Sequence, residues 1–155
     1  MSSRRQWIAA ACAGAALALT APRNAAANFL AAARPALRVR KNPGCGCCDK
    51  WVDHMKALGF DATIVEDENL YAYKQSLGIP RELVSCHTAE VEGYVVEGHV
   101  PGDLVQRMLK EKPNITGIAV AGMPMGSPGM EGGRKDPYDV VAFKKGGPTM
   151  VYARR

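Results

Sequence analysis

The sequence predicts an α/β or α+β fold in a single domain of about 120 residues that follows a targeting segment. Short β-rich segments alternate with segments of helical periodicity through most of the chain, and two β-rich segments follow one another at its end. Alternating strands and helices are typical of a sheet covered by helices, whereas consecutive strands are typical of a hairpin.

The first predicted unit is a strand, a cysteine-containing turn and a helix. Residues 37–40 alternate apolar and basic side chains, which predicts a short strand, and the Asn-Pro-Gly sequence at 42–44 ends it. Trp51, Met55 and Leu58 recur at positions i, i+4 and i+7, which predicts a helix that buries one stripe.

A second strand and a second helix are predicted next. Residues 62–65 are rich in β-branched side chains and predict a strand. Residues 69–77 predict a helix that Gly78 and Pro80 close, and residues 94–96 are again β-rich.

A third helix is predicted from Pro101, a residue suited to the first helical position, to the residues before Pro113. Residues 115–121 predict a strand, and residues 140–143 and 149–152 can pair as a hairpin. With strands and helices alternating first and strands clustered last, we predict a thioredoxin-like sandwich with a β-rich C-terminal extension.

The N-terminus has the pattern of a twin-arginine signal peptide. Arg4 and Arg5 precede an apolar run over residues 7–21, and alanine-rich sequence follows this run where a membrane protein would show a charged stop. The run is too short to span a bilayer comfortably. We therefore predict export to the periplasm with cleavage of the signal; an uncleaved anchor is the alternative.

The predicted domain organisation is a signal peptide over residues 1–33 and one domain over residues 34–155. Small residues at 25–27 and at 31–33 offer two cleavage sites, between which the sequence does not choose. Cys12 leaves with the signal, so four of the five cysteines remain in the mature chain.

The charge of the chain is concentrated in the targeting segment. Three of its 20 basic residues precede Arg34 while all 15 acidic residues follow Ala33, which leaves a net charge of +2 on the mature domain. No basic block with interleaved aromatic residues remains, so the composition argues against nucleic-acid binding. No stable membrane span is expected after cleavage.

Three cysteines, Cys45, Cys47 and Cys48, lie in one turn at the entrance of the first predicted helix. A disulfide between the adjacent Cys47 and Cys48 would be strained, whereas Cys45 and Cys48 have the spacing of a redox pair whose thiolate the helix N-terminus stabilises. Three thiolates in one turn exceed what a dithiol switch requires. We therefore predict a site for a soft metal, with copper(I) first.

The sequence Ser-Cys-His-Thr at residues 85–88 supplies a fourth predicted ligand, Cys86, which sheet pairing can bring to the turn. If this segment is extended, Cys86 and His87 point to opposite faces, so His87 stays open between a ligand and a neighbouring group. His54 is predicted to be a neighbour of the site, and His99 a capping or core-edge residue.

Three methionines, Met123, Met125 and Met130, lie in a loop of Gly and Pro residues with no amphipathic period. Thioether sulfur binds copper(I) without deprotonation, so this loop is predicted to contact or cover a thiolate site. The alternative is that these methionines fill gaps under a long loop.

From about residue 37 to residue 152 the chain resembles a family of small exported bacterial metal-binding proteins, of largely uncharacterised function, that includes the copper-resistance protein CopG. The resemblance rests on four ordered motifs, GCGCC, SCHTA, GYVVEGHVPGD and GMPMGSPGME. It implies a thioredoxin-like fold, a periplasmic location and a cluster of copper ions bridged by Cys45, Cys47, Cys48 and Cys86.

Our leading hypothesis is a protein of copper handling or resistance that binds more than one copper(I) ion through bridging thiolates. Its expected partners are copper ions and other periplasmic copper-handling proteins. One alternative is a thiol–disulfide or copper oxidoreductase, with Cys45 as nucleophile and Cys48 as resolving thiol. The other is a structural zinc site, which would leave the methionine loop unexplained.

Overall fold

The computed structural model describes residues 33–155. The predicted signal peptide lies outside the described residues except for Ala33, and with it Arg4, Arg5 and Cys12. Among the helices of the described part, none combines the length and the apolar character needed to cross a bilayer.

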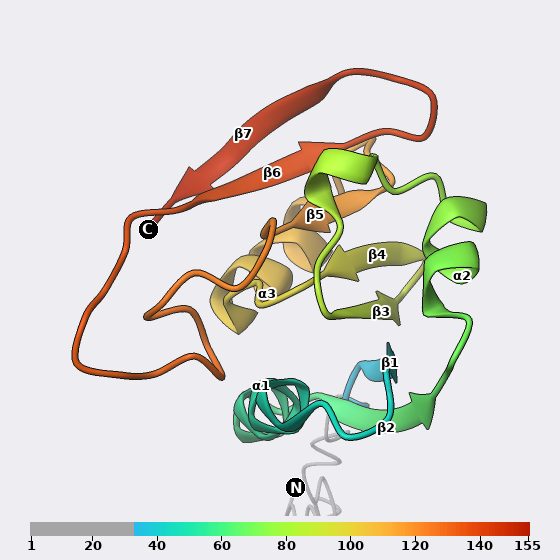
Figure 1. Ribbon diagram of the computed structural model, residues 1–155. Helices are drawn as coiled ribbons and strands as arrows, with labels where there is room; N and C mark the ends of the chain where they lie inside the picture. The colour runs from blue at the N-terminus through green and yellow to red at the C-terminus, as the bar shows by residue number, and fades with distance from the viewer. Residues whose placement is uncertain (1–32) are drawn as a thin grey trace, which may run out of the picture. The chain divides into compact units, whose positions relative to one another are not determined.

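The described residues form one mixed seven-stranded sheet. Its strands are β1 (Ala36–Lys41), β2 (Asp61–Glu66), β3 (His87–Val91), β4 (Tyr94–Glu97), β5 (Gly117–Ala119), β6 (Asp139–Phe143) and β7 (Thr149–Arg154). In space they follow the order β2-β1-β3-β4-β5-β6-β7 (Figure 1). β1 is parallel to β2, β4 is parallel to β5, and the other neighbouring pairs are antiparallel.

The helices are α1 (Gly46–Ala57), α2 (Leu70–Ser76), α3 (Gly102–Glu111) and a short 3-10 helix, η1 (Arg81–Leu83). Trp51 of α1 and Val105 of α3 share one buried cluster with Val96 of β4. Val95, which precedes Val96 in β4, packs with Leu83 of η1 in a second cluster. Because adjacent strand residues face opposite sides, α1 and α3 cover one face of the sheet and η1 covers the other.

The predicted mixed α/β fold class is confirmed, and so is the C-terminal hairpin, formed by β6 and β7. The predicted strand at 115–121 is shorter, only Gly117–Ala119, and Pro101 is the N-cap of α3 rather than its first residue. The sequence analysis predicted no strand at His87–Val91, although β3 lies between β1 and β4. Its central position pairs it on both sides, which compensates for its weak local β propensity.

The pairing of β1, β3 and β4 brings three chain segments to one end of the sheet. Lys41, the last residue of β1, pairs with His87, and Thr88 pairs with Glu97. The end of β1, the start of β3 and the end of β4 therefore meet at the N-terminus of α1. This is the end at which the cysteines lie.

Candidate metal centre

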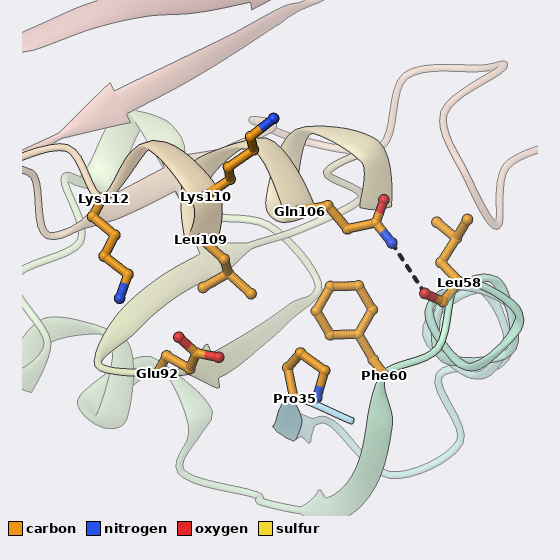
Figure 2. Close-up of a pocket in the computed structure, with 8 residues that line it drawn as sticks. All are labelled: Pro35, Leu58, Phe60, Glu92, Gln106, Leu109, Lys110 and Lys112. Atoms are coloured by element: carbon orange, nitrogen blue, oxygen red, sulfur yellow. Dashed lines mark hydrogen bonds between the residues drawn. The ribbon is translucent and has the colours of Figure 1, made fainter. Parts of the chain in front are cut away.

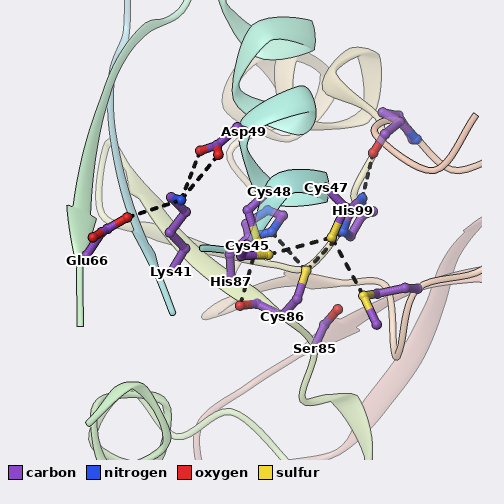
Figure 3. Close-up of a disulfide and its surroundings, with 12 residues drawn as sticks. Lys41, Cys45, Cys47, Cys48, Asp49, Glu66, Ser85, Cys86, His87 and His99 are labelled. Atoms are coloured by element: carbon purple, nitrogen blue, oxygen red, sulfur yellow. Dashed lines mark hydrogen bonds and ion pairs between the residues drawn. A yellow bond between two sulfur atoms is a disulfide. The ribbon is translucent and has the colours of Figure 1, made fainter. Parts of the chain in front are cut away.

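The cysteine turn follows β1 directly and opens α1. Cys45 is the N-cap residue of α1, and Cys47 and Cys48 lie in its first turn. A disulfide joins Cys45 and Cys48, whose Cα atoms are 5.4 Å apart (Figure 3). The free backbone N–H groups of the helix N-terminus face this turn and favour a negatively charged sulfur there.

Lys41 ties the end of β1 to the first turn of α1. Its ammonium group lies 3.0 Å from Asp49 Oδ1 and 3.4 Å from Glu66 Oε1 (Figure 3). The hydrogen bond to Asp49 raises the pKa of Lys41, so this residue is charged at neutral pH. The contact holds the cysteine turn against the sheet from the side opposite the sulfur atoms.

Cys47 is a free thiol on the open side of the turn. Its Sγ lies 3.6 Å from Cys45 Sγ and 3.8 Å from Met123 Sδ. Met123 is about half exposed, so the thiol and the thioether meet near the surface. Sequence analysis predicted this meeting of the methionine loop with the turn.

Cys86 joins the turn from the far side, as predicted. One sulfur of each of Cys45, Cys47, Cys48 and Cys86 lies within 4.8 Å of the others. Cys86 precedes the first residue of β3 and lies in a bend, outside the strand ladder. This position brings its side chain over the N-terminus of α1.

Cys86 and His87 were expected to point to opposite faces only if their segment is extended, and Cys86 lies in a bend instead. Cys86 Sγ lies 3.3 Å from His87 Nδ1, because the bend at Cys86 interrupts the strict alternation of an extended strand. His99 Nε2 lies 2.9 Å from the same sulfur. Cys86, His87 and His99 therefore form a second group of donor atoms within 4.8 Å of one another, next to the cysteine cluster.

His99 is placed by the segment that follows β4, and the sequence analysis did not predict its role. Its Nδ1 lies 2.6 Å from the carbonyl oxygen of Pro128. A carbonyl oxygen only accepts, so Nδ1 carries the proton and Nε2 directs a lone pair at Cys86. Burial lowers the pKa of His99, which keeps the ring neutral and able to bind a metal.

His87 is fully buried, and its ring lies 4.4 Å from the ring of Trp51. Its Nε2 is the buried side-chain nitrogen or oxygen that lacks a hydrogen-bond partner within the described residues. Burial is the main cause that lowers the pKa of His87 well below its ordinary value. Buried polar atoms without a hydrogen-bond partner are rare in native proteins, which marks this imidazole as a candidate functional group.

The thiol of Cys86 is not activated in the metal-free protein. Burial raises its pKa to about 12, and the neighbouring Cys47 adds to this effect. The sulfur would lose its proton on binding a metal, because a metal ion stabilises the thiolate directly.

The methionine loop is held against the site at two points. Ser85 Oγ donates to the carbonyl oxygen of Gly122, and Gly129 lies so close to α1 that an added Cβ would meet Cys47 O at 2.6 Å. Within the described residues no hydrogen bond joins Met125 or Met130 to the cysteine sulfurs, so Met123 is the loop methionine in contact with them.

His54 lies outside the sulfur cluster, in agreement with its predicted place as a neighbour. Its Nε2 accepts a hydrogen bond of 3.1 Å from the backbone N–H of Gly102, at the N-terminus of α3. Burial lowers the pKa of His54. The ring thus links α1 to α3.

The donor set suits a soft metal ion. Four sulfurs within 4.8 Å of one another are close enough to bridge ions, and two neutral imidazoles and one thioether adjoin them. Thiolate and thioether ligands select copper(I), and imidazole binds copper as well. Cys45 and Cys48 become available as ligands only after their disulfide is reduced.

A separate pocket of about 370 Å³ lies between α3 and the segment that joins α1 to β2 (Figure 2). Its wall is apolar at Leu58, Phe60 and Leu109, and Glu92 and Lys112 stand at its rim. No cysteine or histidine lines this pocket. The candidate metal ligands of the described residues are gathered at the cysteine turn instead.

Comparisons with known proteins find one matching family model and two matching solved structures. A family model described as a protein of unknown function, DUF411, matches residues 83–130, which include Cys86, His87, His99 and the methionine loop. No curated protein sequence matches the chain at a significant level.

Two solved structures match nearly over their full length. One, described as copper resistance protein copG, form 2, is 41% identical to this chain with a TM-score of 0.75, and the match covers 79% of this chain and 98% of that one. Form 1 of the same protein is 42% identical with a TM-score of 0.73, over 77% of this chain and 96% of that one. The chain therefore belongs to the protein family, matched by the DUF411 model, that includes the copper resistance protein CopG.

Proposed function

We propose that this protein binds copper(I) in the periplasm and serves copper handling or resistance. The observation that carries the proposal is the convergence of four cysteine sulfurs within 4.8 Å at the N-terminus of α1. The likeness to a copper resistance protein supports copper over other soft metals.

Bridging is the arrangement that this geometry favours. Four thiolates on a single copper(I) would leave a large uncompensated negative charge, and several ions shared among the sulfurs reduce it. The helix N-terminus compensates part of the remaining charge. Cys45, Cys47, Cys48 and Cys86 are the proposed ligands, with Met123, His87 and His99 as further donors; Met125 and Met130 remain predicted contributors of the loop.

The Cys45–Cys48 disulfide sets a condition on binding. Two electrons and two protons, from an external dithiol that becomes a disulfide, convert it into two thiols. We therefore expect the reduced protein to bind more copper(I) than the oxidised protein.

A copper titration tests the proposal. Reduced protein is titrated with copper(I) against a competing chelator, and X-ray absorption identifies the ligand atoms. We expect more than one ion per chain and mainly sulfur ligation. Saturation at one ion, mainly nitrogen and oxygen ligation, or preferential retention of zinc would contradict the cluster.

Export is tested separately. We expect the mature chain to begin near Asn28 or Arg34, and replacement of Arg4 and Arg5 by lysine to block translocation. N-terminal sequencing of periplasmic protein gives the answer. A mature chain that begins at Met1 would contradict cleavage.

The second candidate function is thiol–disulfide exchange, which the observed Cys45–Cys48 disulfide favours. The order β1-α1-β2-α2-β3-β4-α3, with the sheet order β2-β1-β3-β4, supports our inference of a thioredoxin-like fold. In this mechanism the Cys45 thiolate attacks a substrate disulfide and expels one substrate sulfur as a thiolate. The Cys48 thiolate then displaces the other sulfur and closes the Cys45–Cys48 bond.

Cys47→Ser separates the two functions. Cys47 has no part in the exchange cycle, so an oxidoreductase would keep its activity, whereas a bridged cluster would lose copper. We expect copper content and cellular copper tolerance to fall together. Full copper content in this variant, with Cys45→Ser and Cys48→Ser alone defective, would favour the thiol enzyme.

A further inference from the structure

A buried ion pair lies behind the Cys86–His87 segment. Lys74 of α2 and Glu97, the last residue of β4, are 3% and 0% exposed, and Lys74 Nζ lies 2.6 Å from Glu97 Oε1. Neither residue belongs to the proposed ligands. Neither was singled out by the sequence analysis, because a lysine and a glutamate 23 positions apart show no pairing in sequence.

The hydrogen bonds of this pair lead to both ends of the Cys86–His87 segment. Glu97 Oε1 accepts from the backbone N–H of Ser85 at 2.6 Å, and Glu97 Oε2 accepts from Thr88 Oγ1 at 2.6 Å. Lys74 Nζ donates to Thr88 Oγ1 at 2.7 Å. One carboxylate therefore holds the residue before Cys86 and the residue after His87.

The strand ladder alone does not hold Cys86. The pairing of β3 with β4 begins at Thr88 and Glu97, and the N–H of Gly98 adds one bond to the His87 carbonyl. Cys86 and Ser85 precede this ladder. The Ser85 N–H is instead held by the Glu97 side chain, so this contact governs the path of the chain into Cys86.

Stability is a weak reason for such a pair. Removing two charges from water costs several kcal/mol per ion, and apolar replacements of buried ion pairs are often neutral or stabilising. A buried pair that organises a neighbouring segment has another use, because its hydrogen bonds specify one geometry.

We propose that Glu97, neutralised by Lys74, is a positioning residue of the metal centre that holds Ser85 and Thr88 and thereby fixes Cys86 Sγ and His87 Nδ1 toward His99. The proposal rests on the proposed copper function for its physiological meaning. Its geometric content, the fixed position of the Cys86 thiol, applies to the metal-free protein as well.

Two double variants separate the hydrogen bonds from the charges. Lys74→Met with Glu97→Gln is neutral and keeps an oxygen for the Ser85 N–H and an amide for Thr88. Lys74→Met with Glu97→Leu is neutral and keeps neither. Arg107→Gln with Glu111→Gln, which removes an exposed ion pair of 2.9 Å on α3, is the control.

The first measurement is the affinity of the reduced protein for copper(I) buffered by a competing chelator. We expect the double variant with Glu97→Leu to lose copper(I) affinity about 10- to 100-fold, which is the range for residues that orient metal ligands. The double variant with Glu97→Gln and the control variant are expected to keep a copper(I) affinity close to that of the unmodified protein. Thermal unfolding is measured in parallel, and the Glu97→Leu pair should unfold at an equal or higher temperature.

The second measurement uses metal-free protein in which Cys12, Cys45, Cys47 and Cys48 are replaced by serine, so that Cys86 alone reacts. We expect the Glu97→Leu pair to raise the rate of Cys86 alkylation by iodoacetamide roughly tenfold, the equivalent of one lost hydrogen bond. The Glu97→Gln pair should leave this rate unchanged. If the Glu97→Leu pair does not fold, Glu97→Asp, which draws the carboxylate back from Ser85, replaces it with the same expected direction.

The outcomes are distinct. If both double variants keep the affinity and the alkylation rate of the unmodified protein, the positioning role is overturned. An equal fall of the copper(I) affinity in both double variants would also overturn it, because the effect would then be due to charge. If the unmodified protein binds no copper(I), the proposed function fails, and the alkylation rates still decide the role of Glu97.

Discussion

The two sides of the metal centre differ in exposure and in the way they are held. Cys45, Cys47 and Met123 lie at the open side, with Met123 about half exposed and Cys45 able to form a disulfide. His87 and His99 lie on the other side and are fully buried. The thiol of Cys86 touches both sides.

This difference separates two tasks within one site. The buried imidazoles are fixed by packing against Trp51 and by the Pro128 carbonyl, so their nitrogens can anchor a ligand in one geometry. The open side presents soft sulfur donors to solvent. We infer that the open side admits and releases copper while the buried side retains it.

Cys86→Ser is expected to have the largest effect, because Cys86 belongs to both donor groups. We expect the affinity of the most tightly held copper(I) to fall at least about 100-fold, beyond the usual effect of changing a residue that orients a ligand. Chelator competition measures this affinity. Cys47→Ser, on the open side, should lower the number of bound ions but reduce the affinity for the most tightly held ion less than Cys86→Ser does. Equal losses of this affinity in both variants would contradict the difference between the two sides.

His99→Gln is expected to have the next largest effect. It removes the imidazole that faces Cys86 and that Pro128 holds, so we expect copper(I) affinity to fall about 10- to 100-fold. His54→Gln is the matched control on α1, and its affinity should stay within about twofold. A similar loss in both variants would show that general destabilisation, and not ligation, is measured.

Gly129→Ala tests whether the methionine loop must approach α1 closely. Gly129 has φ +89°, and a Cβ there would lie 2.6 Å from Cys47 O and 3.2 Å from His99 Nδ1. We expect a loss of about 1–3 kcal/mol in the free energy of unfolding, measured with denaturant. Gly133→Ala is the control, because a Cβ added at Gly133 meets no atom within 4 Å. It should change the free energy of unfolding by less than about 0.5 kcal/mol.

Met123→Leu is expected to have the smallest effect. The side chain is about half exposed, so unfolding should be unchanged, and copper(I) affinity should fall by less than about tenfold. Transfer of copper to a chelator in stopped-flow experiments should change more than affinity does. Met150→Leu, at an exposed position of β7, is the control. Identical transfer rates in both variants would show that Met123 has no part in the release of copper.

Local patterns in the sequence were sufficient for the first unit of the fold. The helical spacing of Trp51 and Met55 predicted α1, and the glycine- and cysteine-rich turn before it predicted the helix entrance at Cys45. Both signals lie within a few residues of the structure that they describe. The β-rich segments at 140–143 and 149–152 also predicted the two strands of the C-terminal hairpin.

Because strand β3 was not recognised in the sequence, His99 was not predicted to lie at the site. Glu92 and Gly93 both have positive φ and form the two-residue turn between β3 and β4, in which Val91 pairs with Tyr94. Counting back from this turn places Cys86 opposite His99. A Glu-Gly turn is a weaker signal than Asn-Gly or Asp-Gly, so the hairpin and its register were not recognised in the sequence.

By itself the sequence determined which soft donors this protein carries and that three cysteines share one helix entrance, because these properties depend on residue identity and close spacing. Only the tertiary structure decided which distant groups join them. The pairing of β3 between β1 and β4 brings Cys86, His87 and His99 to α1, and buries Lys74 against Glu97 behind them. Such contacts depend on sheet register and on the bend before β3, and a shift of one residue would turn each side chain to the other face.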